Sequence, residues 1–138
     1  GPENVSIQPG GKPTIGKFIQ AVMNPGDEVL YPNPGYPIYE SQIEYHGGIA
    51  VSYRYDETDT GFTIDIEKLK TSVTDKTTAL IYNNYNNPIS AESSREEMEA
   101  LAQIAIKYEL YQIMQIIPNS VDFSKIGSVN FSTKKFMK

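Results

Sequence analysis

Short apolar runs alternate with segments of helical periodicity along this chain, and that alternation limits the folds open to it. The runs at 28–32, 78–82 and 110–117 are mostly apolar, as strands are when both faces of their sheet are covered. The run at 49–55 alternates apolar and polar residues, which is typical of a strand. A further short strand is expected at 3–7. The pattern therefore predicts a sheet of several short strands.

Helical segments separate these runs. Apolar residues recur at helical spacing from Pro13 up to the turn at 24–27. The segment 36–48 is predicted to be a helix that ends at two glycines. The segment 65–73 is predicted to be a short helix that is capped by Asp65.

A capping box predicts the start of the last helix. Ser94 is followed three residues later by Glu97, so each side chain can accept a hydrogen bond from the other residue's backbone N–H. The apolar stripe that follows is made of Met98, Leu101, Ala102, Ala105 and Tyr108. Because strand and helix alternate nearly throughout, the predicted fold class is α/β, a three-layer αβα arrangement with a mainly parallel sheet.

Composition and charge exclude several kinds of function. The chain has 138 residues, which suits one domain, and its net charge of −5 argues against nucleic acid or an anionic membrane as a partner. It has no cysteine and a single histidine, His46, so no metal site is expected. No run reaches the ~20 apolar residues of a membrane span, and we expect a cytoplasmic protein.

Turn residues cluster where the predicted strands end. The stretches at 9–13 (PGGKP), 32–36 (PNPGY) and 83–88 (NNYNNP) lie at or just beyond such ends. In α/β sheets, ligands bind at the carboxyl ends of the strands. These three turns therefore mark the candidate binding site.

In order and spacing, these stretches resemble the large domain of class I and II aminotransferases, which are pyridoxal-phosphate enzymes of fold type I. The resemblance runs from about residue 4 to about residue 113 and rests on PGGKPTIGKFIQAVMNPGDEVLYPNPGYPIYES, TALIYNNYNNPIS and SREEMEALAQIAIKYELY. It implies a partial large domain in 1–117, followed by an atypical tail in 118–138. It also implies pyridoxal 5'-phosphate as cofactor and amino-group transfer between an amino acid and a 2-oxo acid.

The resemblance implies cofactor contacts for four residues. Gly11 and Lys12, where a helix begins, would offer backbone N–H groups to the phosphate, which the helix dipole also favours. Tyr36 would stack on the pyridine ring. Asn87 would donate a hydrogen bond to the phenolate oxygen of the ring.

The chain departs from the family pattern in its catalytic parts. Ile89 and Ser90 stand where the family has Thr-Gly, so the tight turn there lacks the residue that tolerates positive φ. Gln115 stands at the position of the acid that pairs with the pyridinium nitrogen, and a glutamine supplies no anion. Lys125 and Lys134 are the two candidates for the lysine that forms the Schiff base.

Three functions stay open on these residues. In the first, the chain is a truncated part of an aminotransferase and is inactive alone, because the family's small domain and substrate-binding arginine are missing. In the second, it is a degenerate relative that binds or interacts without catalysis. In the third, it is an unrelated doubly wound domain that binds a nucleotide at 9–13. A partial large domain leaves a sheet edge uncovered, so a homo-oligomer is expected.

Overall fold

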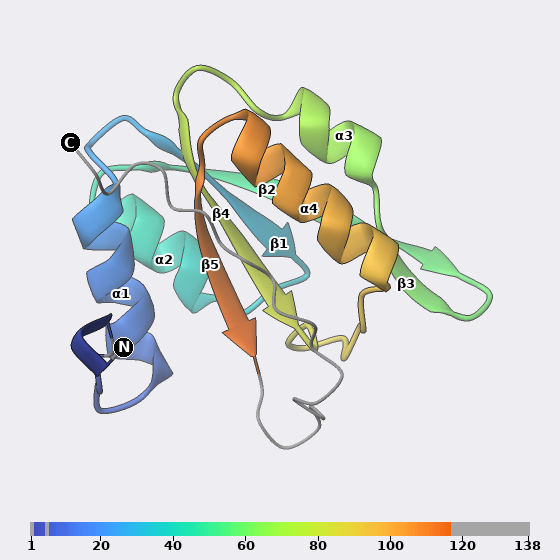
Figure 1. The fold of residues 1–138 in the computed structure, drawn as a ribbon, viewed down its shortest axis with the longest axis horizontal. Coiled ribbons are helices and arrows are strands. Elements are labelled where there is room, and N and C mark those ends of the chain that lie inside the picture. Colours follow the sequence, from blue (N-terminus) through green and yellow to red (C-terminus); the bar gives the residue numbers. More distant parts are fainter. Residues whose placement is uncertain (1, 5, 117–138) are drawn as a thin grey trace.

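The computed structural model of the chain describes residues 2–4 and 6–116, and Figure 1 shows a central sheet with helices on both sides. The sheet has five strands in the order β3-β2-β1-β4-β5. The strands are β1 (Glu28–Asn33), β2 (Ile49–Thr58), β3 (Gly61–Ile64), β4 (Thr77–Asn84) and β5 (Tyr111–Ile116). The helices are α1 (Gly11–Val22), α2 (Ile38–Tyr45), α3 (Ile66–Thr71) and α4 (Arg95–Lys107), preceded by the 3-10 turn η1 (Pro2–Asn4).

The two central strands, β1 and β4, are buried on both faces. In β1, Val29 packs with residues of α1 and α2, whereas the next residue, Leu30, packs with residues of α3 and α4. In β4, Ile81 and Leu80 divide in the same way, and all four side chains are 0% exposed. This alternation is the physical basis of the three layers, because a strand with two apolar faces needs a helix layer on each.

The predicted strands at 28–32, 49–55, 78–82 and 110–117 are confirmed as β1, β2, β4 and β5. These four strands are parallel where they pair, and only β3 is antiparallel to its neighbour β2. The predicted three-layer α/β fold is therefore confirmed. Among the described residues, no helix is long and apolar enough to cross a membrane.

The strand predicted at 3–7 is wrong, and β3 is a strand that the sequence does not predict. Pro2–Asn4 forms a 3-10 turn, and Ile7 is 93% exposed, so no burial holds this segment in a sheet. β3 has four residues, which is too short for a clear period-2 pattern. It forms because it pairs with β2, with Ile64 opposite Tyr55.

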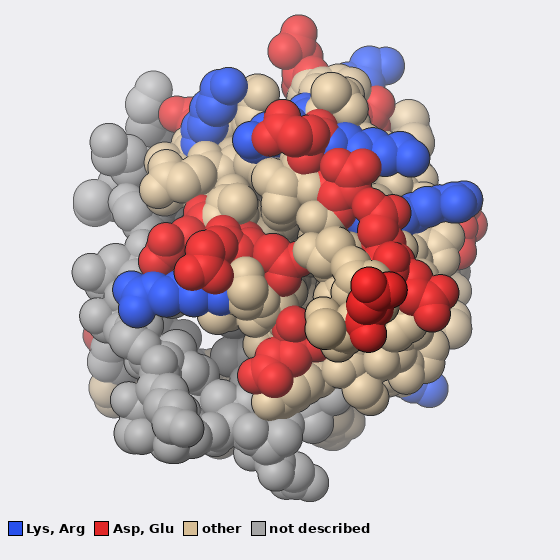
Figure 2. Space-filling model, turned by 90° about the vertical axis from the view of Figure 1, so that its right-hand side faces the viewer, with Lys and Arg blue, Asp and Glu red and all other residues tan. Residues whose placement is uncertain are grey.

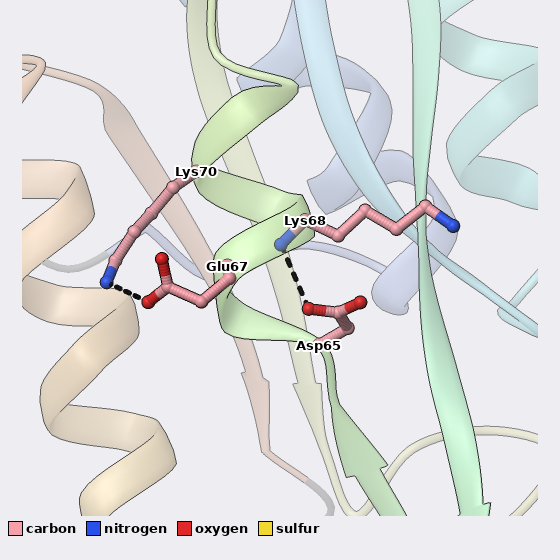
Figure 3. A network of polar contacts seen from close by, with 4 residues as sticks. All are labelled: Asp65, Glu67, Lys68 and Lys70. Carbon is pink, nitrogen blue, oxygen red and sulfur yellow. Dashed lines mark hydrogen bonds and ion pairs between the residues drawn. The ribbon is translucent and has the colours of Figure 1, made fainter.

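The cap predicted for α3 is confirmed. The Asp65 side chain accepts a hydrogen bond from the Lys68 backbone N–H at 2.9 Å, which satisfies one of the free donors at the start of the helix. Figure 3 shows this contact beside the ion pair of Lys70 with Glu67, whose atoms lie 2.6 Å apart. Leu69 lies on the inner side of α3 and is fully buried.

The apolar stripe predicted on α4 is confirmed in part. Leu101 and Ala105 are buried, but Tyr108 is 38% exposed. Ile104, which the predicted stripe omits, is buried in the same cluster as Leu101.

Glu97 joins the start of α4 to strand β3. Both bonds of the predicted capping box form: Glu97 N donates to Ser94 Oγ at 3.1 Å, and Ser94 N donates to Glu97 Oε2 at 2.8 Å. The other carboxylate oxygen, Oε1, accepts from Thr63 Oγ1 at 2.6 Å and from Ile64 N at 2.7 Å. One side chain therefore caps a helix and fixes a short strand that contributes little burial of its own.

We expect Glu97→Ala to lower the free energy of unfolding by about 2 kcal/mol, because the cap of α4 and the anchor of β3 are lost together. Ser94→Ala removes only the cap and should cost about 1 kcal/mol. Urea denaturation followed by circular dichroism measures both changes. The control is Glu99→Ala, which breaks an exposed ion pair with Arg95 and should change stability by less than about 0.5 kcal/mol. Equal losses in E97A and S94A would contradict the second role of Glu97.

Candidate functional site

The three turns singled out in the sequence lie at the same end of the sheet. The parallel strands β1, β4 and β5 end there, at Asn33, Asn84 and Ile116. Helix α1 begins at the same edge. In Figure 1 its first turn lies at the lower end of the molecule, where the arrowheads of β4 and β5 also lie. This carboxyl edge is where ligands bind in open α/β sheets.

Helix α1 begins without a side-chain cap, at the exposed residues Gly10 and Gly11. Gly10, which precedes the helix, has φ 108°, a conformation that favours glycine. A Cβ atom placed on Gly10 or Gly11 would meet no atom within 4 Å. The first N–H groups of a helix have no partner within the helix, and the dipole is positive there, so this end can accept a phosphate.

Lys12, in the first turn of α1, lines an open groove of about 330 Å³ between α1 and α2, together with Lys17 and with His46 from the end of α2. Its backbone N–H follows that of Gly11 at the start of the helix. Within the described part of the chain, no group of three or more histidine, aspartate or glutamate residues could hold a metal ion.

Acidic side chains gather on the opposite side of the molecule. Figure 2 shows carboxylates spread over the face that lies to the right in Figure 1, where β3 and the start of α4 are found. The chain has a net charge of −5, so an anion approaching that face is repelled. The open start of α1 lies on the other side, in a setting better suited to a phosphate.

Tyr36 lies at the carboxyl edge, between β1 and α2. It is half-buried and packs edge-on against Tyr39, with the ring centroids 5.9 Å apart and the planes at 90°. The loop before Tyr36 needs a glycine at position 35, because a Cβ atom there would collide with the carbonyl oxygen of Pro32. Burial, with a smaller effect of Tyr36, raises the pKa of the fully buried Tyr39 to about 12. Tyr36, which is partly exposed and is supported by the buried Tyr39, thus offers an aromatic face on which a ring can stack.

The Asn-rich loop after β4 is tied to the loop that bears Tyr36. The buried Asn86 donates from Nδ2 to the carbonyl oxygen of Pro34 at 3.2 Å. The neighbouring Asn87, assigned to the ring oxygen, is exposed. The structure therefore brings Gly11, Tyr36 and Asn87 to one edge of the sheet.

The turn that lacks the family's glycine is retained in this chain. Ser90 adopts φ 55°, and its N–H donates to the carbonyl oxygen of Asn86 at 2.7 Å, while Asn86 N donates to the carbonyl oxygen of Ala91 at 2.9 Å. A residue with a Cβ atom is strained in this conformation. The strain is confined to the backbone of Ser90, because the two hydrogen bonds still close the loop.

We expect Ser90→Gly to raise the free energy of unfolding by roughly 0.5–1 kcal/mol, because glycine adopts positive φ without steric strain. Thermal and urea denaturation measure the change. Ser72→Gly is the control, since Ser72 has φ −83°. Glycine there adds freedom to the unfolded chain and removes the hydrogen bond from Ser72 Oγ to the carbonyl oxygen of Lys68 at 3.0 Å, at a cost of about 1 kcal/mol. A loss of stability in both variants would contradict the strain at Ser90.

The side chains of three residues with predicted roles lie outside the described part of the structure. Gln115 lies on β5 with its Cα opposite that of Asn83 on β4, but its side chain is outside the described part. Lys125 and Lys134 also lie outside the described residues. The roles of all three stay predictions.

One polar residue at this edge escaped the sequence reasoning. Asn83 is 1% exposed, and neither its Nδ2 nor its Oδ1 has a hydrogen-bond partner among the described residues. Its signal in the sequence is an asparagine that directly continues a buried apolar strand, where an amide has no reason to be placed for packing.

A cluster of tyrosines lies on the α3 and α4 side of the sheet. The rings of Tyr53 and Tyr55 have centroids 6.2 Å apart, and Tyr53 Oη donates to the carbonyl oxygen of Ile81 at 2.9 Å. Burial raises the pKa of Tyr82 to about 12, although a contact with Ser93 lowers it slightly. Burial raises the pKa of all three hydroxyl groups, so they are neutral at ordinary pH.

The raised pKa of Tyr82 makes stability depend on alkaline pH. Its folded-state pKa of about 12 exceeds the value of about 10 for an unfolded tyrosine, so its contribution is complete below pH 10 and is lost as the pH rises through 12. We expect the loss of unfolding free energy between pH 8 and pH 11 to be smaller by about 1 kcal/mol in Tyr82→Phe than in the unsubstituted chain. Urea titrations at both pH values measure it, with Tyr45→Phe, at an 81% exposed position, as the control. An unchanged pH dependence in Y82F would refute this assignment.

Comparison with known proteins decides the family. A family model for aminotransferases of class I and II matches residues 1–115. The chain belongs to the class I and II aminotransferase family. Among its relatives, the aspartate/prephenate aminotransferase of Thermus thermophilus is 34% identical over 114 residues, which cover 81% of this chain and 29% of that protein. The alanine aminotransferase of Mycobacterium bovis is 35% identical over 131 residues, which cover 95% of this chain and 30% of that protein.

Solved structures of aminotransferases show the same fold. The aspartate aminotransferase of Thermus thermophilus with maleate matches with a TM-score of 0.74 and 33% identity, over 78% of this chain and 28% of that one. Cystalysin from Treponema denticola, which contains a pyridoxal 5'-phosphate cofactor, matches with a TM-score of 0.71 and 24% identity, over 76% of this chain and 27% of that one, and so bears on the fold alone. The chain thus spans about a third or less of the length of these family members.

Proposed function

We propose that this chain is the cofactor-binding part of a pyridoxal-phosphate-dependent aminotransferase. The observation that carries the proposal is the uncapped, exposed start of α1, at the edge of the sheet where the loops after β1 and β4 bear Tyr36 and Asn87. The unpaired buried amide of Asn83 at that edge is a further sign that the site is built for a ligand. The residues present therefore fit a phosphate joined to an aromatic ring.

Each residue has a distinct part in holding that cofactor. The N–H groups of Gly11 and Lys12 bind the phosphate, Tyr36 stacks on the ring, and Asn87 donates a hydrogen bond to the ring oxygen. Pyridoxal phosphate supplies an electron-accepting ring and a carbonyl group that takes up the amino group of the substrate. Gln115 contributes no negative charge at the ring nitrogen, so this chain stabilises the electron-accepting form of the ring less than an acid would.

The proposed reaction of the whole enzyme is amino-group transfer between an amino acid and a 2-oxo acid. This chain spans 29% of the Thermus relative, and we propose that it binds the cofactor but does not complete the reaction alone. Lys125 and Lys134 stay the candidates for the lysine that links to the cofactor. Self-association and a cytoplasmic location are further parts of the proposal that rest on the sequence.

The phosphate site is tested by Gly11→Pro, because proline at the first position of a helix keeps the helix but removes the backbone N–H. The ligand is pyridoxamine 5'-phosphate, which has no aldehyde and so forms no covalent bond with lysines. Isothermal titration calorimetry should show binding by the unsubstituted chain that is about ten- to a hundredfold weaker in G11P, as loss of a hydrogen bond to an anion implies. The control is Arg95→Pro, the same change at the first position of α4, which should bind as the unsubstituted chain does. Equal binding by G11P would overturn the proposed phosphate site.

A further inference from the structure

Asn83 is the buried polar side chain that the fold itself does not explain. It is 1% exposed, and both its Nδ2 and its Oδ1 lack a hydrogen-bond partner in the described part of the chain. A buried amide without partners destabilises a folded protein, and natural structures tolerate one chiefly where a ligand, an ion or a water completes it. The amide of Asn83 therefore needs a partner that the described residues do not supply.

Other unpaired polar atoms in the same region have simpler explanations. The hydroxyl groups of Tyr55 and Tyr82 are buried on the α3 and α4 side, where Asn86 and Ser93 lie close enough to lower the pKa of each. A hydroxyl group can rotate towards such a neighbour. The amide of Asn83 differs from them, because no hydrogen-bond partner lies near it among the described side chains.

Asn83 lies near the carboxyl end of β4, on the side of the sheet that faces the proposed cofactor site. Side chains alternate along β4, and Ala79 and Ile81 face the layer of α1 and α2, so Asn83 lies on that same face. It is the next residue towards the carboxyl edge on the face that α1 covers, and its Cα pairs with that of Gln115 on β5. Asn83 thus lies next to the strand position assigned to the ring nitrogen.

We propose that Asn83 is a further ligand-binding residue, whose amide hydrogen-bonds the heteroaromatic ring of the phosphate ester held at the carboxyl edge. The inference rests on the proposed function, because that function supplies the ligand. An amide offers both a donor and an acceptor without a charge. It can therefore pair with the polar atoms of a neutral ring, which suits an edge where the neighbouring position is a glutamine rather than an acid.

The test compares Asn83→Leu, a variant of similar shape without the amide, with the unsubstituted chain. Calorimetric titration with pyridoxamine 5'-phosphate should show about tenfold weaker binding in N83L, while its thermal unfolding temperature without ligand stays equal or rises, because the unpaired amide is gone. Asn83→Ala removes the amide without adding volume and should weaken binding similarly, so the test survives if leucine disturbs folding. The matched control is Asn84→Ala: the neighbouring asparagine accepts a hydrogen bond from Ser93 N at 3.2 Å and should leave the affinity unchanged.

The outcomes separate this inference from the proposed function. Unchanged affinity in folded N83L and N83A, together with weaker binding in G11P, would overturn the role of Asn83 and keep the phosphate site; the amide would then be completed by an internal water. Absence of binding by the unsubstituted chain would overturn both. Weaker binding in N83L and N83A, with normal binding in N84A, supports both.

Discussion

The burial of β1 and β4 on both of their faces is the constraint on which the rest of the structure depends. Val29 and Leu30 are adjacent in the chain and each is 0% exposed, on opposite faces of the sheet. Such strands require helices on both sides, and each connecting helix must run back against the strands because the strands are parallel. The connecting helices α2 and α4 therefore begin at the carboxyl edge. Helix α1, which leads into β1, begins at the same end of the sheet (Figure 1).

At the carboxyl edge, the start of α1 suits an anion, whereas Gln115 is proposed to stand where the family has a negatively charged acid. The start of α1 needs no side chain to attract a phosphate, because its N–H groups and dipole suffice. Ser90 keeps its turn at φ 55° despite its Cβ atom, so the departure from the family's glycine costs stability rather than shape. Gln115 is a different kind of departure: in the proposed site it supplies no charge to the ring, and its Cα pairs with that of Asn83 on β4.

Features that depend on neighbouring residues in the chain could be predicted from the sequence. Asp65 caps α3, and Ser94 with Glu97 forms the capping box of α4, because these contacts span three residues. The strand expected at 3–7 could not be judged in this way, since a strand needs a partner strand and the described residues of this segment pair with none. The same reason hid β3, which exists through its pairing with β2 and through the bonds that Glu97 accepts from Thr63 and Ile64.

The sequence by itself determined the α/β class, most helix and strand positions, the helix caps and, through its order of motifs, the aminotransferase family. These follow from periodicity and from local hydrogen bonding, which act over a few residues. Only the tertiary structure decided that Lys12 and His46 line one groove, that Ser90 accepts a positive φ, and that Asn83 is buried without a partner among the described residues. Burial and pairing of this kind depend on residues far apart in the chain, and no local pattern records them.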